Sequence, residues 1–253
     1  MKNSITAALV AGALAVTGSV VTATPAAAAA VVYQPAYSDD IYYVEDGQTY
    51  LLTLDDWLYL GRPTPKRTAT NYVKYAWSST VYGSTPLPNY LLVEALSPSG
   101  WARAGYPAAT TVAWVPYTFL YQWGTSPELF LYSDVDQVSH KLSFGEWAAS
   151  GFQPPEVFAR EGFYKLGWSD APGIQYVFER DGQPLTGEVI DFAFWASEDF
   201  PTPAAVGRLL GDHFYRYEGS DDIVYFGPTL EGHTLTLDEW LAAGAPAPEL
   251  VRT

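Results

Sequence analysis

The stretch LTLDEWLAAGAPAPE (residues 235–249) decides the fold, because four other segments of the chain repeat its pattern. The clearest copy is LTLDDWLYLGRPTPK at 52–66, and LSPSGW, LSFGEW and IDFAFW are shorter copies. The tryptophans of the five copies are 44, 46, 48 and 45 residues apart: Trp57, Trp101, Trp147, Trp195 and Trp240. A period of this length, written five times, indicates a repeat architecture.

Each copy predicts one short helix with its own start and stop signals. Four residues before each tryptophan stands a good N-cap residue: Thr53, Ser97, Ser143, Asp191 and Thr236. The aliphatic residue before the cap and the tryptophan at N4 can form a hydrophobic staple, so we expect the five helix tryptophans to belong to the core. A glycine four residues after the tryptophan, replaced by Asp199 in the fourth copy, ends the helix after about two turns.

Upstream of each helix the apolar period changes to two, as in Val73, Tyr75 and Trp77, which predicts a half-buried strand. A polar turn, a second β-rich run and a third short run follow, and P-x-x-V segments after the helix suggest a fourth strand. The sequence therefore predicts a mainly β fold with short helices, in five repeats of about 45 residues. The expected repeats span 31–66, 67–110, 111–156, 157–204 and 205–253, within one domain at 31–253.

We favour a closed five-fold, propeller-like ring over an open curved repeat array. Closure would hide the sheet edges that an open array exposes. The last repeat also ends in PAPELV, the piece that precedes a strand in the other repeats, as a ring closed by pairing its two ends would require.

Residues 1–30 have the features of a cleaved signal peptide: a basic start, an apolar run and the small-residue end TATPAAAAA. We expect cleavage between Ala26 and Ala30. The remaining sequence contains no apolar run of membrane-spanning length. We therefore expect a secreted, extracellular protein that is free or held at the cell surface by binding alone, with no membrane insertion.

The charge of the chain excludes one class of partner. Without Lys2 of the signal segment, 13 − 1 = 12 basic residues oppose 28 acidic ones, a formal charge of −16. Nucleic acid binding needs a basic surface, so we expect no nucleic acid partner. The chain has no cysteine, and 16% of its residues are aromatic. Stability must come from packing, and the rings can also stack on flat ligands such as sugars.

Three stretches carry a resemblance to a known group of proteins: YQWGTSPELF at 121–130, HKLSFGEWAASG at 140–151 and EDFPTP at 198–203. They resemble poorly characterised exported repeat proteins of high-GC Gram-positive bacteria. The resemblance implies an exported envelope protein and no specific activity. The repeat period and count are also similar to those of five-bladed β-propeller lectins that bind amino sugars, although no lectin motif is shared.

A second aromatic position closes the first strand of each repeat, beside a polar turn. The aromatic residues are Tyr37, Trp77, Trp123, Trp168 and Tyr217, and the acidic turn residues beside them include Asp39, Glu128, Asp170 and Asp222. Such a ring can stack on the apolar face of a pyranose while the turn supplies hydrogen bonds, so we predict these nine residues as ligand-binding. The alternative is that the rings continue the buried face of the strand.

Signals for catalysis or metal binding are weak. The chain lacks a G-x-S-x-G motif and cysteine, and its three histidines do not have zinc-ligand spacing. His213 is expected in the core, and His140 and His233 in scaffold or surface roles. The DVD at 134–136 lacks the glycine and terminal glutamate of an EF-hand. We predict no catalytic residues, no metal, no cofactor and no enzymatic activity.

The favoured function is that of a secreted, non-catalytic binding protein that recognises cell-wall or environmental glycan through repeated weak sites, strengthened by avidity. A structural or protein-interaction component of the cell envelope, with an envelope protein as partner, is the alternative. A glycoside-active enzyme is the third reading. The glycan hypothesis loses its basis if the aromatics at the strand ends are buried in every repeat.

Overall fold

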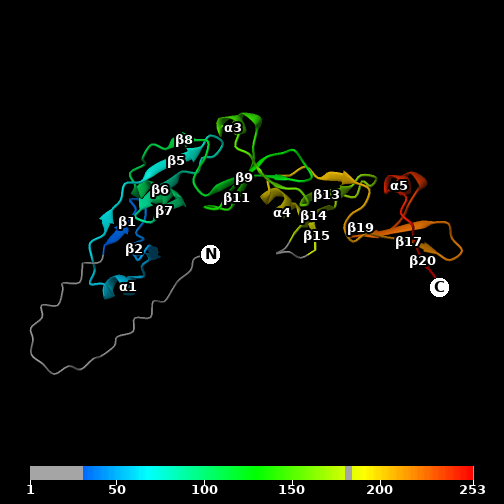
Figure 1. Cartoon of the computed structure of the whole chain (residues 1–253), viewed down its shortest axis with the longest axis horizontal. Helices are drawn as coiled ribbons and strands as arrows, with labels where there is room; N and C mark the ends of the chain where they lie inside the picture. The colour runs from blue at the N-terminus through cyan, green and yellow to red at the C-terminus, as the bar shows by residue number, and fades with distance from the viewer. Residues whose placement is uncertain (1–30, 180–183, 253) are drawn as a thin grey trace, which may run out of the picture. The chain divides into compact units, whose positions relative to one another are not determined.

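The structure is a computed structural model that describes residues 31–179 and 184–252 (Figure 1). The predicted signal peptide lies outside the described residues. The chain divides between Val112 and Ala113 into two compact units, which are described separately. The first unit contains repeats 1 and 2, and the second contains repeats 3, 4 and 5. The predicted single domain stays a prediction.

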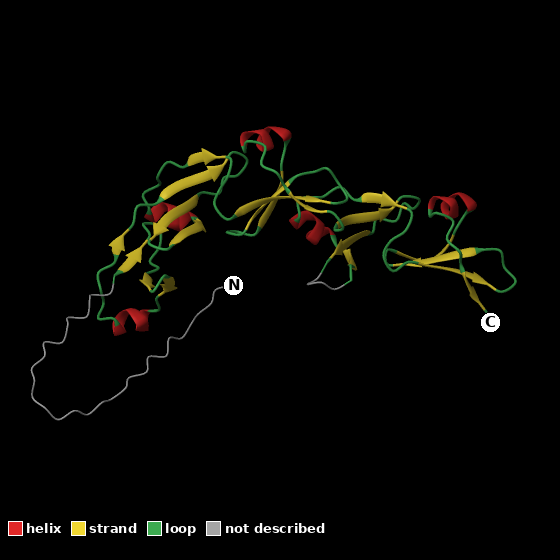
Figure 2. Ribbon diagram, in the orientation of Figure 1, coloured by secondary structure: helices red, strands yellow, loops and turns green. Residues whose placement is uncertain are grey.

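Five times, the chain forms three strands, one short helix and a fourth strand (Figure 2). Repeat 1 consists of β1 (Val32–Gln34), β2 (Tyr42–Glu45), β3 (Gln48–Leu51), α1 (Leu54–Tyr59) and β4 (Lys66–Arg67). Repeat 2 consists of β5 (Asn71–Tyr75), β6 (Tyr82–Leu87), β7 (Tyr90–Ala95), α2 (Pro98–Arg103) and β8 (Thr110–Val112). Repeat 3 consists of β9 (Thr118–Trp123), β10 (Phe130–Ser133), β11 (Val138–Lys141), α3 (Phe144–Ala149) and β12 (Glu156–Phe158). Repeat 4 consists of β13 (Gly162–Leu166), β14 (Ile174–Phe178), β15 (Thr186–Ile190), α4 (Phe192–Ser197) and β16 (Ala204–Val206). Repeat 5 consists of β17 (His213–Tyr217), β18 (Ile223–Gly227), β19 (Leu230–Thr234), α5 (Leu237–Ala242) and β20 (Glu249–Val251).

Each repeat forms its own four-stranded sheet in the order third, second, first, fourth. The first three strands are antiparallel, and the helix carries the chain across so that the fourth strand pairs parallel to the first. The five-repeat, mainly β architecture with short helices is thus confirmed. Each expected repeat boundary falls within a fourth strand, namely β4, β8, β12 or β16. The sequence did not show that this strand belongs to the sheet of the repeat before the boundary.

The closed ring is not confirmed. None of the five sheets that the described residues form is closed. We expected the last segment to complete a ring by pairing with the start of the chain, but β20 pairs with β17 of its own sheet.

The five predicted helices form, and each begins at its predicted N-cap, whose side chain accepts the N3 backbone N–H. Asp56, Glu146 and Glu239 complete capping boxes in α1, α3 and α5. After each helix two successive residues are left-handed, and the first is glycine except in repeat 4, where it is Asp199. An aspartate tolerates this conformation, and its carboxylate also accepts the backbone N–H of Lys141 in repeat 3 at 2.7 Å.

The helix tryptophans are half-buried, so the prediction that they are core residues is only partly right. Each indole Nε1 donates to the backbone carbonyl six residues later, at 2.8–3.1 Å; the acceptors are Pro63, Pro107, Gln153, Pro201 and Pro246. The ring is therefore fixed against the turn that follows the helix. The tryptophans thus link the helix to its turn, and Trp195 and Trp240 also pack against the buried clusters of their unit.

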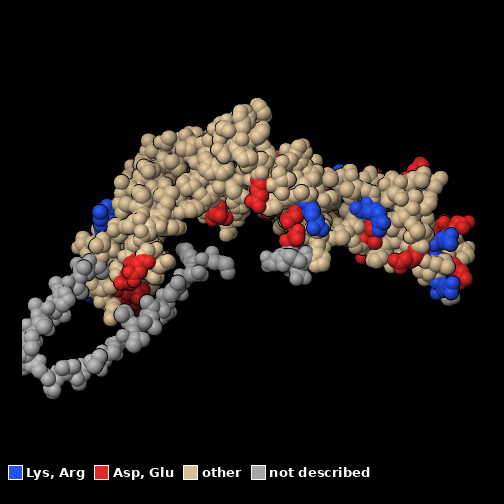
Figure 3. Space-filling view, in the orientation of Figure 1, with Lys and Arg blue, Asp and Glu red and all other residues tan. Residues whose placement is uncertain are grey.

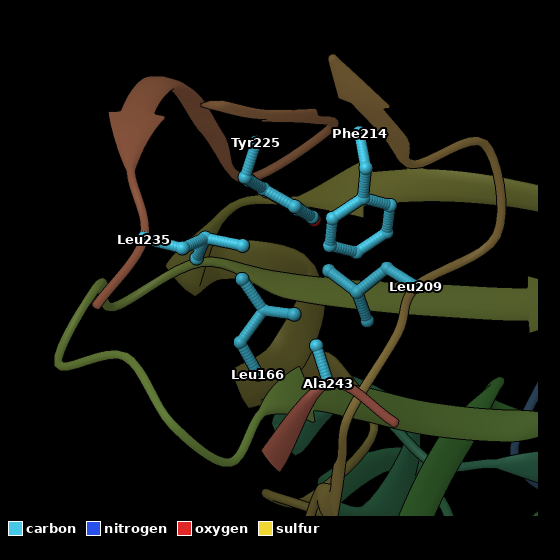
Figure 4. Close-up of a cluster of buried hydrophobic side chains, with 6 residues drawn as sticks. All are labelled: Leu166, Leu209, Phe214, Tyr225, Leu235 and Ala243. Carbon is cyan, nitrogen blue, oxygen red and sulfur yellow. The ribbon is translucent and has the colours of Figure 1, made fainter. Parts of the chain in front are cut away.

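The hydrophobic cores lie between consecutive repeats. In the second unit, side chains of repeats 4 and 5 and their linker meet in one cluster: Leu166, Leu209, Phe214, Tyr225, Leu235 and Ala243 (Figure 4). Repeats 3 and 4 share a second cluster, formed by Tyr121, Trp123, Phe130 and Phe163. In the first unit, Tyr42 of repeat 1 packs with Leu87 and Leu92 of repeat 2. One repeat is too small to bury its own apolar face, so each is stabilised by its neighbour. We call such an interface a junction.

None of the described helices is long and apolar enough to span a membrane.

Candidate binding surface

A serine turn after the first strand aligns the five repeats independently of the helices. Its hydroxyl accepts the backbone N–H two residues later, at 3.0–3.1 Å, in every repeat: Ser38, Ser78, Ser126, Ser169 and Ser220. Tyr37, Trp77 and Trp168 directly precede this serine, whereas Trp123 and Tyr217 stand three residues before it. The prediction that the five aromatics share one position is therefore wrong. Residues two apart on a strand face the same side, so the period-two pattern could not separate the two positions.

Tyr37 is buried in the junction between repeats 1 and 2. A Cβ atom on Gly83 of β6 would lie 2.5 Å from Cε1 of Tyr37, so only glycine leaves room for this ring. Burial, followed by the nearby Glu94, raises the pKa of the Tyr37 hydroxyl. The ring therefore serves as a packing residue.

Trp168 occupies the same position in the junction between repeats 4 and 5. Its ring contacts Tyr225 of β18 edge-on, with centroids 5.1 Å apart, and stacks on His233 of β19 at 5.9 Å. Its Nε1 donates to the carbonyl of Gly207 at 2.9 Å. These contacts with repeat 5 and the hydrogen bond of Nε1 make the half-buried indole part of the junction.

Trp123 reaches the next repeat from the earlier position. It is only 7% exposed and contacts Phe163 of β13 and Tyr176 of β14 edge-on, at centroid distances of 5.5 and 5.6 Å. Trp77 is half-buried and stacks on Tyr75 at 4.6 Å. Tyr217, in the last repeat, is 41% exposed. The five rings therefore do not form one repeated exposed platform, although they are not buried in every repeat.

The acidic turn residues also divide between junctions and solvent. Asp39 forms a salt bridge with Arg103 at the end of α2. Glu128 accepts the backbone N–H and the hydroxyl of Thr202, both at 2.8 Å, and the ammonium of Lys141 at 3.1 Å. Burial opposes ionisation of Glu128, but these hydrogen bonds lower its pKa. Asp170 and Asp222 are exposed. A ligand-binding role for the nine predicted residues stays a prediction.

The histidines have carboxylate partners. His140 Nε2 lies 3.3 Å from the capping carboxylate of Glu146, and His233 Nε2 lies 3.0 Å from that of Glu239. His213 is exposed, stacks on Tyr215 and lies 3.6 Å from a carboxylate oxygen of Glu249, so its expected core position is wrong. Among residues 31–179 and 184–252, no group of three or more His, Asp or Glu residues is placed to hold a metal ion.

The structure reveals an exposed aromatic cluster that the sequence predictions missed. In α3, Phe144 at the first helical position is 74% exposed and lies 6.0 Å from Phe152, which follows the helix. Both rings meet Trp147 edge-on, at 6.2 and 5.0 Å. The same three-ring arrangement recurs in α4, where Phe192 is 70% exposed and lies 5.7 Å from Phe200, around Trp195. We call each group of three rings a helical corner.

Repeat 2 has a smaller version, with exposed Tyr106 edge-on to Trp101 at 5.4 Å. Repeats 1 and 5 carry exposed leucines, Leu54 and Leu237, at the first helical position. The pattern F-x-x-W-x-x-x-x-F marks the two complete corners in the sequence. The sequence alone does not predict this exposure, because apolar residues at helical spacing around a tryptophan are also typical of a buried face.

The corner aromatics occupy an unfavourable backbone conformation. Phe152 and Phe200 have φ of 56° and 55°, in the left-handed region that a bulky residue avoids at a cost of about 1 kcal/mol. Glycine would remove that cost. Because Arg62, Tyr106 and Ala245 adopt the same conformation in the other repeats, it belongs to the end of the helix, and the two corners differ from the other repeats in the aromatic side chains. On the face drawn in Figure 3, the surface over α3 shows neither acidic nor basic side chains.

Comparisons with protein-family models, with curated proteins and with solved structures find no match for this chain. The resemblance to exported repeat proteins therefore stays a prediction.

Proposed function

We propose that the chain is a secreted, non-catalytic binding protein that holds a cell-wall or environmental glycan through repeated weak sites. The observation that carries the proposal is the recurrence of the exposed Phe–Trp–Phe corner in repeats 3 and 4. A contiguous group of exposed apolar side chains is a candidate binding surface, and this one is present in two consecutive repeats. Binding is thereby assigned to the helical corners, while the aromatics at the strand ends mainly join repeats.

The rings of a corner suit a sugar. Phe144 and Phe152 expose ring surface that can stack on the apolar face of a pyranose. Serines beside the corner, Ser143 and Ser150, offer polar groups at its margin. The formal charge of −15 for the whole chain opposes an anionic polymer, so a neutral glycan is favoured.

One corner alone would bind weakly because it is open and small. Two or more corners on one polymer would raise the apparent affinity by about 10² to 10⁴ through effective concentration. Each corner lies within one repeat, so the proposal does not depend on whether the five repeats form the predicted closed ring or an open array.

A structural or protein-binding role in the cell envelope is the second candidate. Leu54 and Leu237 are both 67% exposed at the first helical position of repeats 1 and 5. Branched aliphatic side chains have no flat ring to stack on a sugar, and they are apolar surface that a protein partner could bury. A protein partner would therefore bind at these two leucines.

The test is affinity electrophoresis of residues 31–253 through gels that contain soluble neutral glucans or mannans, with pull-downs on cellulose, chitin and peptidoglycan. One variant combines Phe144→Ala with Phe152→Ala, and a second combines Phe192→Ala with Phe200→Ala. Val189→Ala, at an exposed site on β15, is the matched control.

We expect at least one polymer to retain the wild-type chain, and each double variant to lose about tenfold or more in apparent affinity while staying folded. Absence of retention on every polymer, or equal retention of all variants, would reject the glycan proposal. A protein partner lost on changing Leu54 and Leu237 would instead support the second candidate.

A further inference from the structure

Repeat 5 exposes residues that lie in a junction in repeat 3, and repeat 1 carries residues that match the other half of that junction. Tyr217 of repeat 5 and Trp123 of repeat 3 are equivalent, because both end the first strand and pair with the last residue of the fourth. Trp123 is 7% exposed beneath repeat 4, whereas Tyr217 is 41% exposed. Tyr217 therefore lacks the cover that its equivalent Trp123 receives from the next repeat.

The junction between repeats 3 and 4 shows what such an aromatic binds. Trp123 contacts Tyr176 on the second strand of repeat 4. Two residues after the turn serine, Glu128 accepts two hydrogen bonds from Thr202, which lies in the Pro-Thr-Pro segment after α4. This junction therefore combines an aromatic contact to a tyrosine with a carboxylate that accepts hydrogen bonds from a threonine.

We call the surface of a repeat that faces the following repeat its donor side and the surface that faces the preceding repeat its acceptor side; these names do not refer to hydrogen bonding. Repeat 5 carries the same donor side as repeat 3. It has an aromatic, Tyr217, at the position of Trp123. It has a small residue, Gly219, before the serine, where repeat 3 has Thr125 and repeats 1, 2 and 4 have large aromatics. Asp222 stands two residues after the serine, as Glu128 does, and is exposed.

Repeat 1 carries the same acceptor side as repeat 4. Tyr43 on β2 pairs with Val32 as Tyr176 on β14 pairs with Phe163, so the two tyrosines are equivalent. Thr64, seven residues after Trp57, matches Thr202, seven after Trp195, and each is flanked by prolines. The other three repeats have Ala108, Pro154 and Ala247 there. Tyr43 is half-buried and Thr64 is exposed.

We propose that the donor side of repeat 5 binds the acceptor side of repeat 1 in a second copy of this chain, so that copies associate head to tail. Tyr217 would pack on Tyr43 of the next copy, and Asp222 would accept from Thr64. The interface is heterologous, since it joins two different surfaces of the chain. It continues the junctions already present between repeats. A second copy needs only these two surfaces, whereas closure of one chain on itself also requires every internal junction to turn by a matching angle.

Sedimentation velocity of residues 31–253, from about 1 µM to about 500 µM, tests the proposal. Tyr217→Glu disables the donor side, and Thr64→Glu places a carboxylate opposite Asp222 and disables the acceptor side. Val157→Glu, at an exposed site on β12, introduces the same charge elsewhere. Both disabled residues are exposed, so the variants should fold.

We expect the average mass of the wild-type chain and of Val157→Glu to rise with concentration beyond that of a dimer. Each disabled variant alone should stay monomeric, and an equal mixture of the two should stop at a dimer, because the mixture retains one intact donor side and one intact acceptor side. A wild-type chain that is monomeric throughout, as a chain closed on itself would be, overturns the proposal. Association that persists in either disabled variant also overturns it.

Discussion

At the residue scale, the indole Nε1 of each helix tryptophan donates a hydrogen bond to the turn that follows its helix. In repeat 5, Trp240 Nε1 donates to the carbonyl of Pro246 at 3.0 Å and thereby fixes the turn after α5. We expect Trp240→Phe to keep most of the ring contacts and lose this bond, which lowers the free energy of unfolding by about 1 kcal/mol. Urea unfolding at neutral pH measures the effect.

Trp114→Phe is the control, because Trp114 is exposed and lies outside the helical corners. If Trp240→Phe were as stable as this control, the hydrogen bond would not be what maintains the tryptophan at this position.

Several residue roles were predictable from the sequence, and others were not. The N-caps, capping boxes and left-handed terminators act within a few residues, so local pattern was sufficient to predict them. The roles of Trp123 and Trp168 depend on Tyr176 and Tyr225 of the next repeat, which one strand cannot reveal. The exposure of Phe144 could not be predicted either, because an apolar residue three positions before a helix tryptophan is also typical of a core residue.

At the element scale, the capping box of α5 makes stability depend on pH. The backbone N–H of Thr236 donates to Glu239 and lowers the pKa of that carboxyl, against a smaller effect of burial. Since the folded-state pKa lies below the unfolded value of about 4.3, the ionised group stabilises the fold above that pH. The contribution is lost as the pH falls through the folded-state pKa.

We therefore expect Glu239→Gln to lower the urea midpoint at pH 7 and to leave it nearly unchanged near pH 3. Asp238→Asn, one residue earlier in the same helix, removes a charge without touching the cap. An equal effect of Glu239→Gln at both pH values would show that the cap does not act through its ionised carboxylate.

The elements themselves followed from the sequence with small errors. The five helices and the strand pattern formed as expected because each repeat carries its own signals. The pairing of β20 with β17 was not foreseen, since the sequence marks a strand without naming its partner. That pairing places β20 at an edge of the repeat 5 sheet, next to β17, and leaves the side chain of Tyr217 41% exposed.

At the scale of the whole molecule, two sets of aromatic residues have different tasks. Rings at the strand ends, such as Trp168, join consecutive repeats and should determine stability. Rings at the helical corners, such as Phe144, are exposed and should determine binding. This division of tasks predicts opposite outcomes for substitutions in the two sets.

The most direct test measures stability and polysaccharide retention on the same two variants of residues 31–253. We predict that Trp168→Ala lowers the free energy of unfolding by about 3 kcal/mol while its folded fraction is retained like the wild type. We predict that Phe144→Ala with Phe152→Ala changes stability by less than about 1 kcal/mol and loses about tenfold or more in retention. Loss of retention in folded Trp168→Ala, with full retention in the double variant, would contradict the claim and return the binding site to the strand ends.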